Sequence, residues 1–268
     1  MLRLPAVSGT FYPDNPKELA RQIHDLLEPE VVQEKASCRA CLVPHAGYVY
    51  SGHVAAAVYK RIQLPKRIVI LGVRHFPYGA EAAILSNGAW RTPLGDAPIH
   101  AELAAKISSA CPLLREDSVA HEGEHSLEVQ IPFLQVLDPG FSFVPIALGM
   151  IRFDELASIG ESLAKILSAH PEVFLLTTSD FNHYEDDVTT RRKDRLAIEH
   201  ILQLDPRGLF DVCRKEKISM CGLGPVVATL TALHRVGVAD AELVKYATSA
   251  DVSGDTSAVV GYGGFVFR

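Results

Sequence analysis

The sequence lacks any apolar run long enough to cross a membrane. Among its 268 residues no uninterrupted apolar stretch approaches the roughly 18 residues that a transmembrane helix needs. The amino-terminal segment MLRLPAVSGTFYP also lacks the apolar core of a secretory signal. We therefore expect a cytoplasmic protein without a membrane partner.

Basic residues are few and dispersed. The formal net charge is −6, and the one short basic run, Arg191-Arg192-Lys193, is interleaved with acidic residues. Because nucleic-acid-binding domains carry a basic patch or stripe, we expect no nucleic-acid partner. The sequence also contains no G-x-G-x-x-G dinucleotide motif and no Walker A motif.

Cysteine occurs five times, an odd number that argues against a disulfide framework and favours reduced thiols. Cys38 and Cys41 form a single C-x-x-C pair. Without a second pair, a four-cysteine zinc site is not indicated. The pair also lies at the start of a strand-like run instead of opening a helix, so we do not expect a redox role.

The sequence does contain an alternation of strand-like and helical patterns. Apolar spacing predicts helices over roughly 16–30, 153–168 and 190–203, and another in which Pro225 takes the first position. The predicted strands are CRACLVP, KRIVILGV, EAAILS, FSFVPIALG, EVFLLTTS, AELVKYAT and VVGYGGFVF. Nearly continuous apolar runs are typical of strands buried on both faces. We predict an α/β fold with a mostly parallel central sheet flanked by helices, in one domain over residues 1–268.

Three of these strands are each followed by polar residues. ACLVP leads to His45, RIVILGV to His75, and VFLLTTS to Asp180 and His183. Ligands of open α/β sheets bind outside the carboxyl ends of the strands. A single loop histidine more often bonds the backbone, but the recurrence of the arrangement favours a shared site. Imidazole is the commonest metal ligand and general acid or base near neutral pH, so a metal-centred or histidine-centred site is predicted.

The segments around these strand ends refine the prediction. Ser51 is expected to cap a helix that starts near Gly52, which makes His53 an ordinary helix residue. Asp180 either orients a histidine or serves as a turn acid. Cys221 stands in a Gly-rich turn before a helix, a position that lowers a thiol pKa and favours the thiolate. The alternative for Cys221 is a small buried apolar residue.

His121-Glu122-Gly123-Glu124-His125 matches the H-E-x-x-H motif of zinc metalloproteases. That motif needs one continuous helix, and Gly123 in mid-helix costs about 1 kcal/mol relative to alanine. We expect a helix to begin near Glu124, with His121 outside it. The segment is therefore not predicted to bind zinc in that way.

Together these blocks resemble the Memo family, whose fold is similar to that of class III extradiol dioxygenases. The matching blocks are PAVSGTFYP, PHAGYVYSG, LGVRH, RTPLG, HEGEHSLEVQIPFL, TTSDFNHY, MCGLGP, YATSADVSGD and VVGYGGFVF. The resemblance implies a metal site formed by His45, His75 and Cys221. It places His183, with Asp180, beside that site, and His125 as a further lining residue.

The sequence departs from the family pattern on both sides of His75. Arg74 stands where Ser or Asn is usual, and Phe76 stands where some members have a second histidine. An arginine at this position adds positive charge, which would select an anionic ligand or weaken metal binding.

We expect a non-haem metal protein with Fe(II) as the preferred ion, Cu or Zn as alternatives, and dioxygenase-like oxidoreductase chemistry. His183 is expected to transfer protons, with Asp180 and His125 beside it. Two further interpretations stay open, a non-catalytic adaptor that binds a metal or a peptide, and a metal-dependent hydrolase. The ligand is then a small molecule or a peptide. The resemblance also implies a radical-SAM protein and an AMMECR-type protein as partners.

Overall fold

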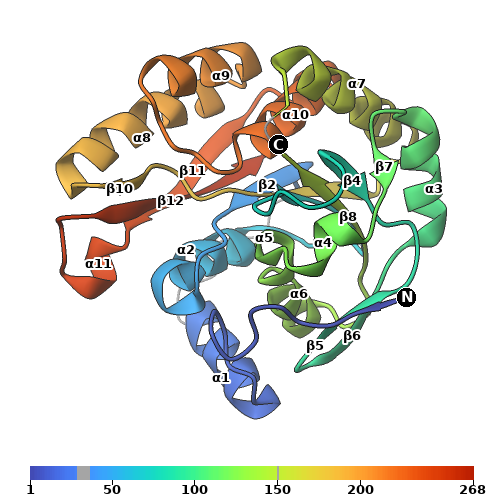
Figure 1. Cartoon of the computed structure of the whole chain (residues 1–268), viewed down its shortest axis with the longest axis horizontal. Helices are drawn as coiled ribbons and strands as arrows, with labels where there is room; N and C mark the ends of the chain where they lie inside the picture. Colours follow the sequence, from blue (N-terminus) through green and yellow to red (C-terminus); the bar gives the residue numbers. More distant parts are fainter. Residues whose placement is uncertain (29–36, 150) are drawn as a thin grey trace.

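The computed structural model describes residues 1–28, 37–149 and 151–268, which form an α/β fold around a central mixed sheet (Figure 1). The α/β prediction is confirmed. The strands are β1 (Leu2–Arg3), β2 (Ala40–Val43), β3 (Arg67–Val73), β4 (Ala82–Ile84), β5 (Ala89–Thr92), β6 (Gly95–Pro98), β7 (Arg115–Glu116), β8 (Ser142–Leu148), β9 (Val173–Thr178), β10 (His183–Glu185), β11 (Ala241–Thr248) and β12 (Val259–Phe267). All seven predicted strands are present.

The central sheet has a parallel middle and antiparallel edges. Its strand order is β10-β12-β2-β9-β3-β8-β4-β7, and β11 pairs with β12 outside this path. Strands β2, β9, β3 and β8 run parallel to one another. Strand β12 pairs antiparallel with β2, and β4 antiparallel with β8. The sheet is therefore mixed, and the predicted parallel arrangement holds for its four central strands.

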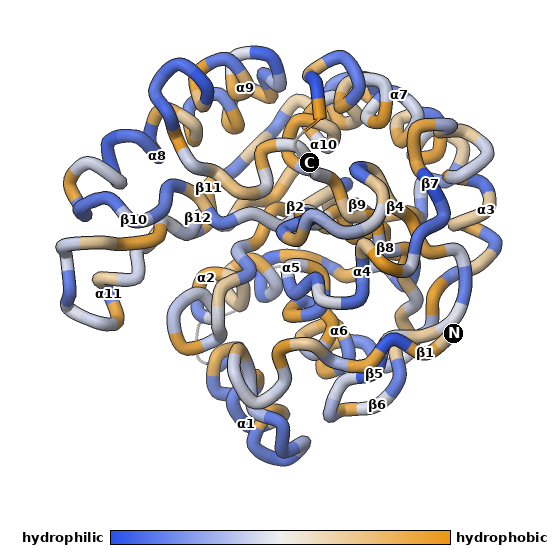
Figure 2. The backbone as a smooth tube through the Cα atoms, viewed as in Figure 1, coloured by the Kyte–Doolittle hydropathy of each residue, from blue (hydrophilic) through white to orange (hydrophobic). Residues whose placement is uncertain are grey.

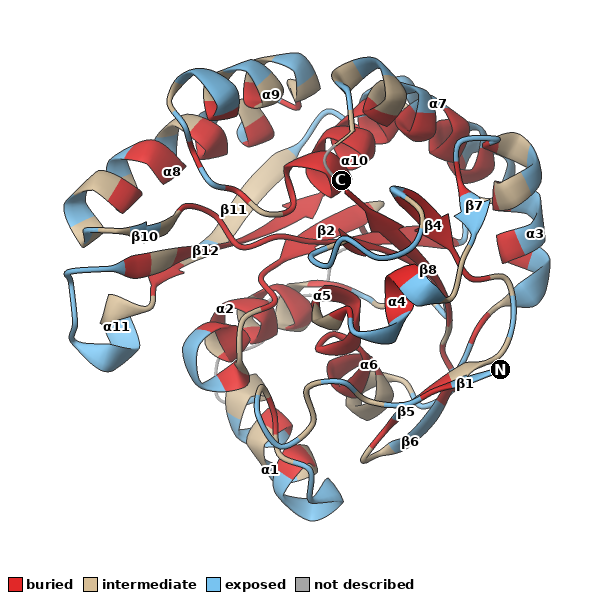
Figure 3. Cartoon of the chain, viewed as in Figure 1, coloured by how far each residue is buried: buried red, intermediate tan, exposed pale blue. Residues whose placement is uncertain are grey.

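The central strands are apolar throughout because helices cover both faces of the sheet. Along β3, Val69 and Leu71 join a core cluster that includes residues of α7 (Phe153–Ala169) and α10 (Leu223–Arg235). Ile68 and Ile70 belong to a second cluster, with residues of α1 (Pro16–Leu27), α2 (Tyr48–Arg61) and α6 (Ile131–Leu137). Figures 2 and 3 show these strands as hydrophobic and buried, with polar, exposed residues on the outer helices. Because successive side chains of a strand point to opposite faces of the sheet, the apolar residues of β3 pack into the cores on both faces.

The helices that cover the sheet include the predicted ones. They are α1 (Pro16–Leu27), α2 (Tyr48–Arg61), α3 (Ala101–Ala110), α4 (Val119–Glu122), α5 (His125–Glu128), α6 (Ile131–Leu137), α7 (Phe153–Ala169), α8 (Asp187–Leu202), α9 (Pro206–Lys215), α10 (Leu223–Arg235) and α11 (Ala250–Ser253). The last two residues of the helix predicted over 16–30 lie outside the described residues. Within the described ranges, no helix combines the length and hydropathy of a membrane span.

Two predicted helix starts are wrong. Helix α2 begins at Tyr48 with Gly47 as its N-cap, so Ser51 lies inside the helix. The start is set by a distant segment, because the Tyr48 amide donates to the carbonyl of Phe11 at 2.8 Å. Helix α10 begins at Leu223, which makes Pro225 its third residue instead of its first. Proline is tolerated there because first-turn amides have no partner within the helix.

A buried ion pair attaches the amino-terminal segment to α5, the short helix that carries His125. Arg3 on β1 is bonded to Glu128 of α5, and their side chains are 2% and 0% exposed. Glu128 also accepts hydrogen bonds from the Tyr12 hydroxyl at 2.5 Å and from the Ala6 amide at 2.8 Å. Arg3 donates further to the carbonyls of His121 and Glu124. Each charge is therefore compensated without water.

Replacing Glu128 with alanine is expected to destabilise the fold by about 3–5 kcal/mol, because Arg3 keeps its charge in a dry site without a counter-ion. Urea denaturation measures the loss. The control is Asp96→Ala, which removes the partner of Arg91 from an ion pair whose side chains are 49% and 42% exposed. That pair is solvated, so little change is expected. Equal losses for the two variants would contradict the role given to the buried pair.

Candidate metal centre

The candidate site lies at the carboxyl ends of three adjacent parallel strands. Strand β9 pairs with β2 on one side and with β3 on the other. Because the three strands end at the same edge of the sheet, the residues that follow them meet there. These residues are His45 after β2, His75 after β3, and Asp180 after β9. This is the crevice that the strand-end pattern predicted.

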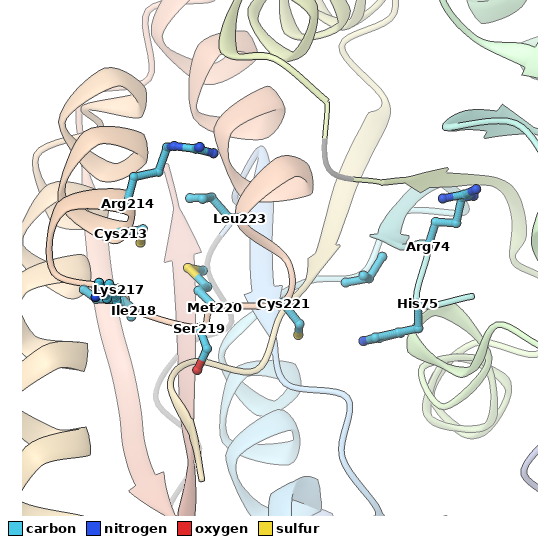
Figure 4. Close-up of a pocket in the computed structure, with 11 residues that line it drawn as sticks. Arg74, His75, Cys213, Arg214, Lys217, Ile218, Ser219, Met220, Cys221 and Leu223 are labelled. Carbon is cyan, nitrogen blue, oxygen red and sulfur yellow. The ribbon is translucent and has the colours of Figure 1, made fainter. Parts of the chain in front are cut away.

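The structure brings His45, His75 and Cys221 together, and we call these three residues the donor group. Their ligand atoms all lie within 4.8 Å of one another. Sγ of Cys221 lies 3.2 Å from Nε2 of His45. Tetrahedral bonds of about 2.0–2.3 Å separate two ligand atoms by roughly 3.5 Å, so the spacing suits a transition metal. The His75 ring points toward Cys221 (Figure 4).

Both histidine rings of the donor group are oriented through Nδ1. Nδ1 of His45 lies 2.8 Å from the Thr178 hydroxyl, and Nδ1 of His75 lies 2.9 Å from Oε1 of Glu124. Neither contact engages Nε2, and Nε2 of His45 faces Sγ of Cys221 instead. Metal-bound histidines in proteins use this arrangement, in which an outer carboxylate or hydroxyl fixes the ring.

Glu124 is the residue of this site that the sequence did not assign a role. It is 1% exposed and also accepts from the amides of His75 at 2.7 Å and Ser126 at 2.8 Å. Burial acts to raise its pKa, but the hydrogen bonds and charge of His75 outweigh burial and hold the pKa at about 2. Glu124 is therefore an ionised carboxylate that fixes both the backbone and the ring of His75. The only signal in the sequence was a Glu next to a crevice histidine.

Cys221 lies close to the two histidines of the donor group because its turn packs tightly against the end of β9. A Cβ atom on Gly222 would lie 2.4 Å from the carbonyl oxygen of Thr178, so this approach requires glycine. The Asp180 amide donates to Sγ of Cys221 at 3.3 Å. The expectation of a lowered thiol pKa is wrong, because burial and the nearby Asp180 carboxylate raise the pKa of Cys221.

The ring of His125 stacks on the ring of His75. Its ring lies 4.6 Å from that of His75 at an angle of 16°, and it meets the Phe11 ring edge-on at 4.8 Å. Burial and the neighbouring His45 lower its pKa to about 4. Donor atoms of His75, Glu124 and His125 also lie within 4.8 Å of one another. In that second group, however, Nδ1 of His75 is already engaged by Glu124.

Asp180 and His183 lie at the same site but are not bonded to each other within the described structure. Oδ1 of Asp180 accepts from the His45 amide at 2.8 Å. Nδ1 of His183 lies 3.0 Å from the Ser219 carbonyl, and the His183 amide donates to the Ser219 hydroxyl at 2.8 Å. Ser219, which the sequence did not indicate, therefore orients His183, and Asp180 instead fixes the backbone of His45.

One nitrogen of the His183 ring is engaged by this contact. A carbonyl oxygen only accepts, so Nδ1–H donates to it and Nε2 is left for another partner. His183 lines a cavity of about 700 Å³, which we call the histidine cavity. All three donor residues and His125, Asp180 and Ser219 also line it, with the aromatic residues Phe11, Tyr50 and Tyr184. This volume is typical of small-molecule sites.

Arg74 does not direct its charge at the donor group. Its guanidinium forms an ion pair with Glu81 at 3.1 Å and donates to the carbonyls of Tyr78 and Gly79. The positive charge of Arg74, next to His75 in the sequence, is therefore compensated by Glu81. Phe76, the second departure, is 47% exposed.

The H-E-x-x-H segment does not form one helix. His121 ends up in α4 and His125 in α5, with Gly123 and Glu124 between the two helices. The prediction that His121 lies outside the helix that follows is confirmed. His121 is fully buried against Trp90, with a ring distance of 5.8 Å. The two histidines therefore do not share a helical face.

The segment that leads into His183 is anchored by a buried acid whose charge state changes near neutral pH. Asp194 accepts from the Asn182 amide at 2.9 Å and from the Tyr246 hydroxyl at 2.7 Å. Burial raises its pKa to about 7, against the lowering effect of these hydrogen bonds. The folded protein therefore holds a proton that the unfolded chain loses above about pH 4.

Stability is consequently expected to fall as pH rises from about 4 to 7, since the folded state binds more protons in that window. Between pH 5.5 and 8.5 the Asp194 contribution falls by about 2 kcal/mol. The Asp194→Asn variant keeps the shape without titrating, so its urea midpoint should lose this part of the pH dependence. An unchanged pH profile in the variant would show that Asp194 is already ionised in the fold.

Comparison with known proteins identifies relatives along the whole chain. A profile of the family described as Memo-like protein matches residues 3–266. A MEMO1 family protein of Methanopyrus kandleri is 41% identical over 281 residues, covering 100% of this chain and 99% of the relative. A MEMO1 family protein of Sulfolobus acidocaldarius is 40% identical, with 98% of each chain covered.

A solved structure has a similar fold. The crystal structure of an uncharacterized protein from Escherichia coli K12 matches with a TM-score of 0.52 at 11% identity. The match covers 83% of this chain and 98% of that protein. At such low identity the likeness concerns the fold and carries no information on activity.

Proposed function

The chain belongs to the Memo-like protein family, and we propose that it is a non-haem metal protein whose ion is held by His45, His75 and Cys221. The observation that carries the proposal is the convergence of three donor atoms within 4.8 Å at one edge of the sheet. The orientation of both rings through Nδ1 supports it, because Nε2 of each is left for the ion.

The chemistry of the donor atoms favours a transition metal over magnesium or calcium. Imidazole and thiolate suit iron, zinc and copper, whereas magnesium and calcium prefer oxygen ligands. We propose Fe(II) because the family resemblance implies a fold similar to that of extradiol dioxygenases, with Zn(II) and Cu(I) as the alternatives that sulfur ligation favours. A bound Fe(II) ion supplies Lewis acidity and one-electron redox chemistry.

The chain's own residues then bind the substrate and move its proton. The histidine cavity, at about 700 Å³, holds a small molecule against the donor group, with Phe11, Tyr50 and Tyr184 among its walls. Nε2 of His183 accepts a proton from a substrate hydroxyl in this cavity, while the Ser219 carbonyl holds Nδ1–H. His125, stacked on His75, forms part of the same wall. We propose an oxidoreductase reaction of the dioxygenase type.

Elemental analysis of protein purified without oxygen tests the metal proposal. We expect about one iron, zinc or copper ion per chain, as a single three-residue site predicts. A protein that takes up none of these ions during anaerobic incubation with each would contradict it. Oxygen uptake by the Fe(II) form with catechol as probe tests the reaction. Tight metal binding without oxygen uptake would instead favour a non-catalytic metal-binding module.

A further inference from the structure

A second cavity borders the donor group, and most of its lining residues differ from those of the histidine cavity. It has a volume of about 510 Å³ and shares His75, Ser219 and Cys221 with the histidine cavity. Its remaining lining residues are Val73, Arg74, Cys213, Arg214, Lys217, Ile218, Met220 and Leu223. We call this space the basic chamber, since three of these residues are cations and none is an acid (Figure 4).

The cations of the basic chamber are not equivalent. Arg74 is compensated by Glu81 and is 10% exposed at its side chain. Arg214 and Lys217 are exposed and have no acidic partner within the described residues, although the Arg214 guanidinium lies 5.5 Å from the centre of the Phe210 ring. Arg214 comes from the last turn of α9 and Lys217 from the segment after it, on the wall opposite Arg74 (Figure 4). The uncompensated charge of the chamber is therefore gathered on one wall.

The backbone of Lys217 adopts a conformation that favours glycine. Lys217 has a left-handed conformation with φ of 53°. It follows α9 in a helix-end turn in which the Ile218 amide donates to the Cys213 carbonyl at 2.8 Å. Glycine is the usual residue at this position of such a turn because it adopts positive φ without strain. A lysine here therefore costs stability relative to glycine.

We propose that the basic chamber binds an amphipathic carboxylate whose apolar part lies along Ile218, Met220 and Leu223. Arg214 and Lys217 hold the carboxylate, since a guanidinium fork matches its two oxygens. The other end of the molecule then reaches His75 and Cys221. This inference rests on the proposed function and names its substrate class, an apolar molecule with a carboxylate at one end and the reacting hydroxyl at the other.

Titration calorimetry on the metal-free, full-length protein tests the chamber separately from the metal. Octanoate is the probe, and octylamine has the same apolar chain with the opposite charge. We expect octanoate to bind at least about tenfold more tightly than octylamine, and to bind more weakly as salt rises. Absence of octanoate binding, or equal binding of the two probes, would overturn the proposal whatever the metal content.

Single substitutions show which of the two cavities octanoate occupies. Arg214→Gln and Lys217→Gln should each weaken octanoate binding about five- to tenfold. Arg207→Gln should change it less than about twofold, because Arg207 lies on the same helix but pairs with Asp211 away from the chamber. Tyr184→Ala alters the histidine cavity alone. If Tyr184→Ala weakens binding and Arg214→Gln does not, the probe occupies the other cavity and the proposal is wrong.

Lys217→Gly separates loss of binding from loss of structure. Glycine relieves the positive φ, so the melting temperature should rise by about 1–3 °C while octanoate affinity falls as in Lys217→Gln. Unchanged affinity in this variant would exclude Lys217 from the binding site. Arg214→Glu should abolish the preference for octanoate, because the new carboxylate offsets the charge of Lys217; a retained preference for octanoate would count against the assignment.

Discussion

His75→Ala should lower the affinity for the bound metal by more than about 100-fold, with His45→Ala and Cys221→Ser behaving alike. Each variant removes one of three donor atoms that lie within 4.8 Å of one another. Removing an outer-shell partner already costs about 10–100-fold in metal affinity, so losing a direct ligand should cost more. Competition with a chromophoric chelator under anaerobic conditions measures the affinity, and elemental analysis gives the metal content.

Two further variants test whether the loss of metal affinity is specific to the donor group. His53→Ala removes a histidine of α2 that is not among the lining residues of either cavity, and it should keep full metal content. Glu124→Gln keeps the donor atoms but loses the charge that orients His75, so an intermediate loss of about 10–100-fold is expected. Full metal content in all three donor variants would mean that the protein holds no metal at this site.

The central part of the fold was predictable because burial on both faces leaves a strong local signal. Strands β2, β3, β8 and β9 are nearly continuous apolar runs in the sequence, and each was predicted. The short strands β5, β6 and β7 were not. Their residues are partly exposed, as the burial patterns of β6 and β7 show, so no apolar run marks them. The antiparallel edges of the sheet depend on pairing between distant segments, which a local pattern does not encode.

The sequence was enough to infer that the site residues meet at one edge of the sheet. It was not enough to infer the hydrogen-bond partners of their side chains. Three polar groups after three strands indicated one edge of the sheet, and the structure brings His45 and His75 together there. The bond between His75 and Glu124 joins residues 49 positions apart, and that between His183 and Ser219 joins residues 36 apart. Such contacts depend on tertiary packing. The start of α2 shows the same limit, because its first amide is satisfied by Phe11.

His183→Ala is expected to keep the metal and to lower the rate of oxygen uptake with catechol by about 10²–10⁴-fold. His183 lies outside the donor group, so its loss removes no ligand. Nδ1 of its ring lies 3.0 Å from the Ser219 carbonyl, which leaves Nε2 to accept the substrate proton in the histidine cavity. Metal content and oxygen uptake must be measured on the same preparation, so that a low rate is not confused with a low occupancy.

A structural histidine would give the same loss of rate, so the decisive readout is chemical rescue. If His183 transfers a proton, added imidazole should restore part of the rate in His183→Ala, because a free base can enter the space left by the ring. Restored activity that depends on imidazole concentration and on its unprotonated fraction would identify proton transfer. Loss of metal to the same degree as in His45→Ala would instead make His183 a ligand, and the three-residue donor group would have to be redrawn around it.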